Sequence, residues 1–245
     1  QATDGEFGGV YDFYFDDRQW TVRYIVADTG DWLPGRKVLI APDAIATIDP
    51  DARTVVVNLT RRQIELSPPI DSDQPVSRQH EIELSRYYRW PIYWPGNPET
   101  ATVSIGIPET TALLGTMTPP GTPQASPDNT GKQQGDPNLR SAYYVKGYTL
   151  DAADGQLGHV EDFIIDTASW GIRYMVIDTR NWLPGKHVLV PPQRISRIDW
   201  SQSRVEVDLL RDVIKNGPEY NPDVPLTPRI EKLLREYYKL NDVPA

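Results

Sequence analysis

The sequence of 245 residues contains no cysteine and only three histidines. Without cysteine the chain can form neither a disulfide nor a thiolate metal site, and it has no thiol nucleophile. The histidines, His80, His159 and His187, have no partner at a metal-ligand spacing, so we expect surface or structural roles for them. The sequence therefore predicts no metal site and no cofactor.

Positive charge and long hydrophobic runs are also scarce. The chain has 25 Lys and Arg against 34 Asp and Glu, a formal net charge of -9, which disfavours a general nucleic-acid binder because it repels phosphate. No run reaches the roughly 18 apolar residues of a spanning helix. No basic segment precedes an apolar stretch near the N-terminus, so we expect no signal peptide and favour a cytoplasmic location.

Proline is abundant, and its distribution is uneven. Nine of the 23 prolines fall between Trp90 and Pro137, in a segment otherwise rich in Gly, Thr, Ser, Asn and Gln. Such a composition cannot bury enough apolar surface to fold alone, so residues 90–137 are predicted to be a linker with an extended or polyproline-like centre. Its start, Trp90 to Trp94, carries too many aromatic residues for an inert spacer and is expected to dock somewhere.

An internal repeat lies on both sides of this linker. Residue n aligns with residue n + 150 without a gap from Gln1 to Arg89, and 18 of the 35 pairs from Gly8/Gly158 to Pro42/Pro192 are identical. This pattern indicates a duplication, with repeat 1 at residues 1–89 and repeat 2 at residues 138–245. Repeat 1 lacks a counterpart of the apolar stretch that opens repeat 2. We therefore expect either an N-terminal truncation or another segment in the place of that strand.

Short strands with turn signals about every ten residues predict a small all-β barrel or sandwich in each repeat. A single helical turn over 211–215 and a helix over 227–239 should follow, the latter capped by Thr227. Its buried face is expected to carry Ile230, Leu233, Leu234 and Tyr237. Repeat 1 should end in a similar helix over 77–89. The strands expected in repeat 2 are 144–150, 158–166, 171–178, 187–190, 195–199 and 205–209.

Three motifs in each repeat resemble the PRC-barrel domain. They are Asp-Gly-x-x-Gly-x-Val-x-Asp-Phe-x-x-Asp from Asp4, Trp-x-x-Arg-Tyr-x-Val-x-Asp-Thr from Trp20 and Trp-Leu-Pro-Gly from Trp32, each recurring 150 residues later. The family takes its name from the cytoplasmic domain of the photosynthetic reaction centre H subunit, and a related barrel occurs in the ribosome maturation factor RimM. The resemblance implies two mainly β barrels of about six bent strands, each followed by a short helix, with no known catalytic centre.

Aromatic residues are the candidates for partner contact. Trp32-Leu33 and Trp182-Leu183 form the most apolar turns of the chain, and each Trp either covers its own barrel or anchors a partner. The same two alternatives apply around the start of the linker, where prolines oppose a helix that would bury the aromatic side chains. These residues are Tyr87, Tyr88, Trp90, Tyr93 and Trp94.

Four aspartate positions recur in both repeats, and paired carboxylates could divide acid and base roles. Three of them fall where strands end, where Asp commonly bonds the backbone of the next turn. Asp12 and Asp162 lie inside strands, and we expect structural ion pairs with Arg23 and Arg173. Because no nucleophile elbow or nucleotide-binding loop accompanies them, the sequence predicts no catalytic residue and no enzyme. The expected turn caps are Asp16, Asp28 and Asp49, with Asp166, Asp178 and Asp199.

These features predict a non-enzymatic scaffold or docking protein that binds a protein complex and no nucleic acid. The resemblance sharpens this to a peripheral, H-subunit-like component on the cytoplasmic side of a photosynthetic reaction centre complex, without direct membrane insertion. One alternative is a free-standing soluble stress or regulatory protein. The other is a RimM-like ribosome assembly factor, which the net charge disfavours.

Overall fold

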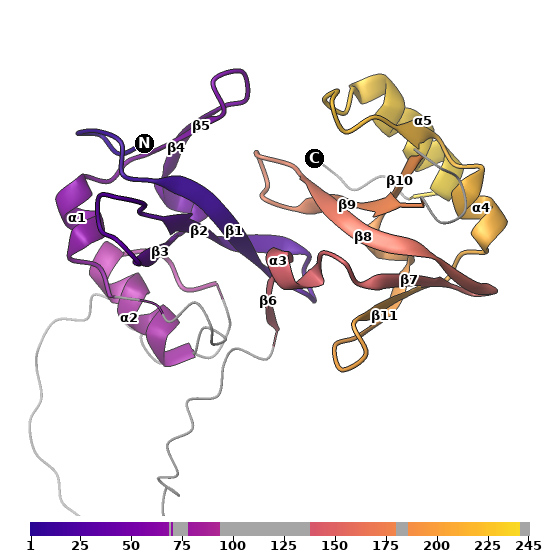
Figure 1. Ribbon diagram of the computed structural model, residues 1–245, viewed down its shortest axis with the longest axis horizontal. Helices are drawn as coiled ribbons and strands as arrows, with labels where there is room; N and C mark the ends of the chain where they lie inside the picture. Colours follow the sequence, from indigo (N-terminus) through magenta and orange to yellow (C-terminus); the bar gives the residue numbers. More distant parts are fainter. Residues whose placement is uncertain (69, 71–77, 94–137, 180–185, 241–245) are drawn as a thin grey trace, which may run out of the picture.

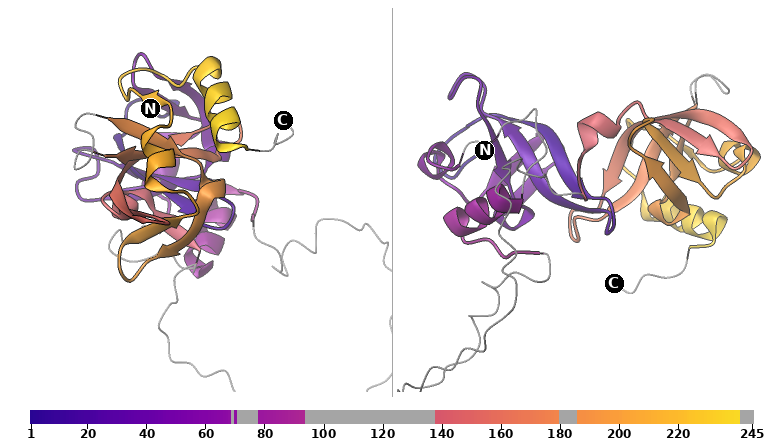
Figure 2. Two further views of the ribbon diagram at one scale, coloured as in Figure 1. Left: turned by 90° about the vertical axis from the view of Figure 1, so that its right-hand side faces the viewer. Right: turned by 90° about the horizontal axis from the view of Figure 1, so that it is seen from below.

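The computed structural model describes residues 1–68, 70, 78–93, 138–179 and 186–240 (Figure 1). These residues form two lobes that lie side by side (Figures 1 and 2). The described residues up to 93, together with one strand at 139–141, make the first lobe, and the described residues from 142 onwards make the second. The fold is mainly β, as the sequence predicts.

The first lobe contains two sheets. Its larger sheet has the strand order β3-β2-β1-β6, and β4 pairs with β5 in a separate hairpin. Two helices follow this hairpin. The elements are β1 (Gly9–Asp16), β2 (Thr21–Asp28), β3 (Lys37–Ile40), β4 (Ile45–Asp49), β5 (Thr54–Val57), α1 (Arg61–Glu65), α2 (Arg78–Tyr88) and β6 (Leu139–Ser141).

The second lobe contains one seven-stranded sheet in the order β11-β12-β7-β8-β9-β10-β13. Its strands pair antiparallel except β12 and β7, which are parallel. The elements are α3 (Ala142–Val145), β7 (Thr149–Ala152), β8 (Gly155–Ile165), β9 (Ile172–Asp178), β10 (His187–Val190), β11 (Ile195–Asp199), β12 (Arg204–Val207), α4 (Arg211–Lys215), β13 (Glu219–Tyr220) and α5 (Pro228–Tyr238).

The expectation of closed barrels is not met, because strand pairing leaves each sheet open among the described residues. In the second lobe, β11 and β13 are the two ends of the sheet. In the first lobe, no described strand takes the position that β7 holds between β8 and β12, so the β4–β5 hairpin is separated from β1. Bulges after Val10 in β1 and after Val160 in β8 bend both strands at the same repeat position.

Two local predictions were wrong in detail. Residues 144–150 were expected to be a strand, but Ser141 caps α3 by accepting a hydrogen bond from the Tyr144 amide, and β7 begins only at Thr149. In α5, the buried side chains are Leu234 and Tyr238, four residues apart on one helix face. Leu233 and Tyr237 are 49% and 37% exposed instead.

The lobes meet along a seam at which equivalent backbone groups exchange hydrogen bonds. The Val22 amide donates to the Trp170 carbonyl at 2.8 Å, and the Ile172 amide donates to the Trp20 carbonyl at 2.7 Å. Val22 and Ile172 are equivalent positions of the two repeats, and so are Trp20 and Trp170. The contact therefore resembles the self-complementary interface of a two-fold dimer. Phe15 and Val22 belong to the same hydrophobic cluster as the core of the second lobe.

Candidate functional site

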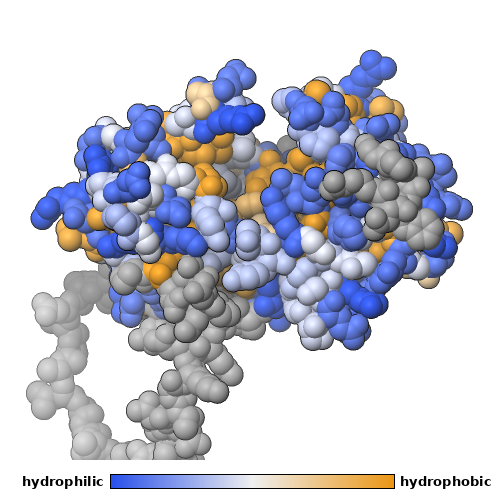
Figure 3. Space-filling view, in the orientation of Figure 1, coloured by the Kyte–Doolittle hydropathy of each residue, from blue (hydrophilic) through white to orange (hydrophobic). Residues whose placement is uncertain are grey.

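A hollow of about 380 Å³ lies at this seam, beside the segment that follows α2. Residues Thr21 to Tyr24 of β2 form one wall, and Ser169 and Trp170 of the second lobe form another. The rest of the lining comes from the first lobe: Ala41, Pro42, Asp43, Ser85, Trp90, Pro91 and Tyr93. The hollow thus joins four segments, three of the first lobe and one of the second. Figure 3 shows apolar surface on both lobes where they face each other.

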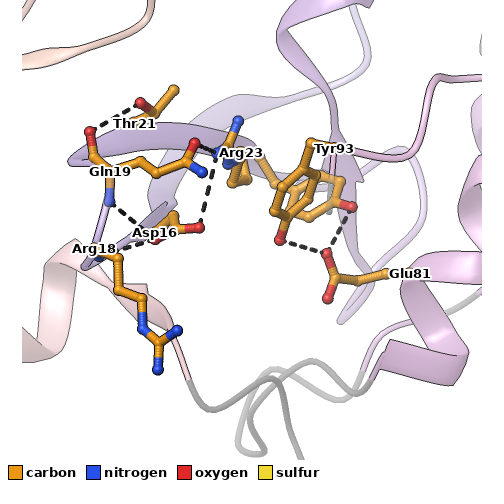
Figure 4. Close-up of polar contacts among 8 residues, drawn as sticks. Asp16, Arg18, Gln19, Thr21, Arg23, Glu81 and Tyr93 are labelled. Atoms are coloured by element: carbon orange, nitrogen blue, oxygen red, sulfur yellow. Dashed lines mark hydrogen bonds and ion pairs between the residues drawn. The ribbon is translucent and has the colours of Figure 1, made fainter. Parts of the chain in front are cut away.

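A buried carboxylate holds one wall of this hollow in place. Glu81 of α2 is fully buried, and its Oε2 accepts hydrogen bonds from the hydroxyls of Tyr24 at 3.0 Å and Tyr93 at 2.8 Å (Figure 4). A buried charge is costly unless it is hydrogen-bonded or paired. The two phenols therefore stabilise Glu81, and Glu81 in turn fixes Tyr93 against β2.

Arg23 connects this carboxylate cluster to the seam. Its guanidinium lies 4.0 Å from the ring centroid of Tyr93, a cation–π geometry, and 3.7 Å from Oδ2 of Asp16 (Figure 4). Asp16 also accepts hydrogen bonds from the amides of Arg18 and Gln19. One continuous polar network therefore runs from the turn after β1 to α2.

The two predicted Asp–Arg pairs were wrong. Arg23 pairs with Asp16, and Arg173 pairs with Asp166 at 3.0 Å. The strand register explains the difference, because Asp16 lies opposite Thr21 in the β1–β2 ladder whereas Asp12 lies opposite Val26. Arg23 is therefore closer to the end of β1 that carries Asp16.

Asp12 instead connects the first lobe to α3. It accepts hydrogen bonds from the Ser141 hydroxyl at 2.5 Å and from the Tyr143 amide at 2.9 Å. Burial nevertheless raises the pKa of Asp12 above its usual value, because desolvation outweighs these bonds. Its repeat counterpart Asp162 is exposed and pairs with Lys146 Nζ at 3.1 Å.

The predicted turn caps are confirmed at five of the six aspartates. Each accepts at least one backbone amide from the turn that follows it, for example Gly30 to Asp28 at 2.9 Å and Ala52 to Asp49 at 2.9 Å. These carboxylates therefore satisfy the backbone where strands end. The five are Asp16, Asp28, Asp49, Asp166 and Asp199.

The turn tryptophan of repeat 1 covers its own lobe. Trp32 is partly buried and packs edge to face on Phe7 at a centroid distance of 6.5 Å. The Arg61 guanidinium lies 4.5 Å from the centroid of the Trp32 ring. Leu33 is half-buried beside it. The predicted contact residues Trp182, Leu183 and Trp94 lie outside the described residues.

The aromatic residues around the end of α2 also pack within the first lobe. Tyr88 stacks on Trp90 at 4.1 Å between ring centroids, and burial raises the pKa of Tyr88 to about 12. The Tyr87 hydroxyl donates to the Gln63 carbonyl at 2.8 Å. Together with the Tyr93–Glu81 bond, these contacts show that the start of the predicted linker docks on its own lobe.

Among the described residues, the sequence did not reveal an exposed aromatic cluster, which we name the tyrosine patch: Tyr11, Tyr143 and Tyr144. These side chains are 45%, 56% and 60% exposed. Tyr11 of β1 stacks on Tyr143 of α3 at 5.8 Å between ring centroids, and Lys37 Nζ lies 3.5 Å from the centroid of the Tyr11 ring. The sequence pattern predicts a strand from Tyr144, whereas the helical turn of α3 exposes both Tyr143 and Tyr144.

The histidines make local contacts. His187 Nε2 lies 2.7 Å from Glu161, and His80 Nδ1 lies 3.9 Å from Glu83. Burial lowers the pKa of His80. In the part of the chain that the structure describes, no three His, Asp or Glu side chains come together as a metal site would require.

The second lobe is a single bent sheet of short strands, and α4 and α5 bury Ile214, Leu234 and Tyr238 in its core, which places it among small β domains. The family model of the PRC-barrel domain matches residues 149–214, from β7 into α4, so the chain contains a PRC-barrel domain in this region. No curated protein matches the chain. None of the helices within the described residues is long and apolar enough to cross a membrane.

Proposed function

We propose that this chain is a non-enzymatic docking protein built from two PRC-type barrels, residues 1–89 and 138–245, joined by residues 90–137. The order of elements supports the proposal that residues 1–89 form a barrel of the same type as residues 138–245. Each strand and helix from β1 to α2 has a counterpart from β8 to α5, and β3 and β10 are offset by 150 residues at both ends. The family match to residues 149–214 supports this fold for the second copy, and the shared order of elements is our reason to extend the proposal to the first.

The proposal that this protein docks on a partner rests on the tyrosine patch. Tyr is enriched among residues that dominate binding energy, because it buries a large apolar ring while its hydroxyl remains hydrogen-bonded. Tyr143 and Tyr144 are more than half exposed, yet the stack with Tyr11 holds their cluster in place. A pre-ordered aromatic surface loses little conformational entropy when a partner covers it.

The partner we propose is the cytoplasmic face of a photosynthetic reaction centre complex, in the manner of an H subunit. Support comes from the resemblance of both repeats to that family. The protein would attach through protein contacts at the tyrosine patch and the seam, as a peripheral component. Its acidic character, with a net charge of -9, suits a basic partner surface.

The test is co-purification with detergent-solubilised native reaction centre complex at low salt. We expect the full chain to elute with the complex, and Tyr143→Ala/Tyr144→Ala to weaken binding at least tenfold. Leu233→Ala is the matched control, because Leu233 is similarly exposed at 49% but lies on α5. Circular dichroism of each variant checks that the fold is retained.

Three outcomes would overturn this assignment. Native complex that contains none of the protein at low salt excludes the H-subunit-like role. Recovery only in the soluble fraction favours a free-standing regulatory protein. Co-sedimentation with small ribosomal particles favours a RimM-like assembly factor.

A further inference from the structure

The helix pair that follows the last hairpin packs in the same way in both repeats. In the second lobe, the Tyr237 hydroxyl of α5 donates to the Val213 carbonyl of α4 at 2.7 Å. In the first lobe, the Tyr87 hydroxyl of α2 donates to the Gln63 carbonyl of α1 at 2.8 Å. The two tyrosines are similarly exposed, at 37% and 39%. The surfaces around this contact can therefore be compared position by position.

Three positions around the contact are polar in the first repeat and apolar in the second. Thr60, Gln63 and Glu83 of the first repeat correspond to Leu210, Val213 and Leu233 of the second. Leu210 and Leu233 are 52% and 49% exposed. Because the polar version supports the same helix packing, the fold does not require these apolar side chains. They leave apolar surface in water that another surface can cover.

The apolar side chains form one surface, which we name the helix face: Leu210, Val213, Leu233 and Tyr237. Leu233 and Tyr237 are one turn apart on the same side of α5. Leu210 and Val213 belong to the first turn of α4, and the bond from Tyr237 to Val213 joins the two helices. Figure 1 shows both helices on the outside of the second lobe. The helix face is therefore continuous and accessible.

The charges beside Leu233 match those of a second copy of α5. Arg229 lies one turn before Leu233 and Glu236 lies nearly one turn after it, and all three side chains are exposed. When two copies of the helix cross antiparallel at Leu233, residues before it in one copy face residues after it in the other. Arg229 of each copy then faces Glu236 of the other, while the two leucines meet at the axis.

The ion pair within α5 does not oppose this arrangement. Lys232 Nζ lies 3.9 Å from Oε1 of Glu236, and the two side chains are 79% and 63% exposed. Such an exposed pair contributes little to stability, so Glu236 remains available to Arg229 of another copy. Repeat 1 lacks this complementarity, because it has Glu83 and Arg86 at the positions of Leu233 and Glu236.

We propose that the helix face joins two copies of this chain in a two-fold dimer, with α5 of one copy antiparallel to α5 of the other. Leu233 lies at the axis, and Val213 and Tyr237 extend the apolar contact. Two Arg229–Glu236 pairs fix the register and the orientation. The contact surface is small, so the dimer is weak and reversible at micromolar concentrations. Each copy keeps its tyrosine patch, on β1 and α3, available for another partner.

Sedimentation equilibrium of the full chain over a range of concentrations tests the dimer. We expect the apparent mass to rise towards twice that of one chain, and Leu233→Glu to weaken association by at least about tenfold. This variant places in repeat 2 the residue that repeat 1 tolerates as Glu83, so the fold should be retained. Leu66→Glu is the matched control, because Leu66 is 58% exposed on the first lobe. A chain that stays monomeric up to about 1 mM would overturn the proposal.

Charge exchange tests the antiparallel register. Glu236→Arg and Arg229→Glu should each weaken the dimer, because like charges then face each other across the axis. The double variant should restore association, since each new glutamate again faces a new arginine. Failure of the double variant to restore the dimer, or a dimer that is insensitive to Leu233→Glu, would show that the copies meet elsewhere.

The absence of cysteine from the chain allows a direct test of the axis. Leu233→Cys should form a disulfide-linked dimer in oxidised glutathione, and Leu66→Cys should remain monomeric under the same conditions. Equal cross-linking of both variants would contradict a specific contact. Leu233→Glu should lose the dimer and keep reaction-centre binding, whereas Tyr143→Ala/Tyr144→Ala should do the reverse. Failure of one proposal is thus distinguishable from failure of the other.

Discussion

Phe13 and Phe163, which occupy the same position in the two repeats, meet edge to face across the seam with ring centroids 5.7 Å apart and an interplanar angle of 82°. Phe15 packs on Phe163 as well, at 5.6 Å. A residue meets its own counterpart only where two copies are related by a rotation close to two-fold. The seam therefore joins the copies as a homodimer interface would, within one chain.

Removing one ring of this pair should destabilise the whole protein. Phe163 is 7% exposed, so Phe163→Ala is expected to lower the free energy of unfolding by about 3 kcal/mol. A double-mutant cycle with Phe13→Ala should give a coupling of about 1 kcal/mol, because the rings contact each other. Urea unfolding measures both, and Tyr144→Ala should change stability by less than about 0.5 kcal/mol. Additive effects of the two Phe substitutions would contradict the contact.

The phenol of Tyr93 should contribute to stability through Glu81. Tyr93→Phe removes a hydrogen bond to a buried carboxylate, so we expect a loss of about 1.5 kcal/mol in urea unfolding. The same change at Tyr143, an exposed tyrosine, is the control and should be nearly neutral. Equal effects at the two positions would show that Glu81 does not hold Tyr93.

Gly158 within β8 and Gly9 at the start of β1 should respond differently to an added methyl group. A Cβ at Gly158 would lie 2.1 Å from the Asp178 carbonyl oxygen, whereas a Cβ at Gly9 would meet nothing within 4 Å. Gly158→Ala must therefore shift backbone and should cost about 1–3 kcal/mol. The free energy of unfolding of Gly9→Ala should lie within about 0.5 kcal/mol of the wild-type value. Thermal or urea unfolding of both variants decides the point.

Asp12 and Asp166 should give opposite pH dependences. The pKa of Asp12 is raised by burial, so the folded chain binds this proton more tightly, and Asp12 lowers stability as the pH rises from about 4 through its folded pKa. As the pH rises over this range, Asp12→Asn should therefore become more stable relative to wild type. The Asn side-chain oxygen can still accept from the Tyr143 amide, and its NH2 group can donate to the Ser141 hydroxyl oxygen.

At Asp166 the hydrogen bond from Ser169 is the main cause of a lowered pKa. Its stabilising contribution is present above about pH 4 and is lost as the pH falls through the folded pKa. Asp166→Asn should therefore lose stability relative to wild type as the pH rises. Urea unfolding between pH 3 and 7 compares both variants, and a shift of the same sign in both would contradict these assignments.

Much of the local structure could be predicted from the sequence. The helix α4 and the strands β10 and β11 have the bounds that the pattern predicts, and α5 begins after its Thr227 cap. Five of the six turn aspartates were also predicted correctly, because Asp bonds amides only two or three residues away. Contacts across the sheet were not predictable in this way. The partner of Arg23 depends on the β1–β2 register, which two bulges shift.

The self-similarity at an offset of 150 residues, the short-strand pattern and the turns follow from the sequence, since each depends on residues close together in the chain or on direct comparison of its two ends. Where the two lobes meet and what their aromatic residues cover depends on tertiary packing. Trp90 and Tyr93 close over their own lobe, while Tyr143 and Tyr144 are left exposed. Burial is a property of the packed whole, because a side chain is covered only by whatever residues the fold brings over it.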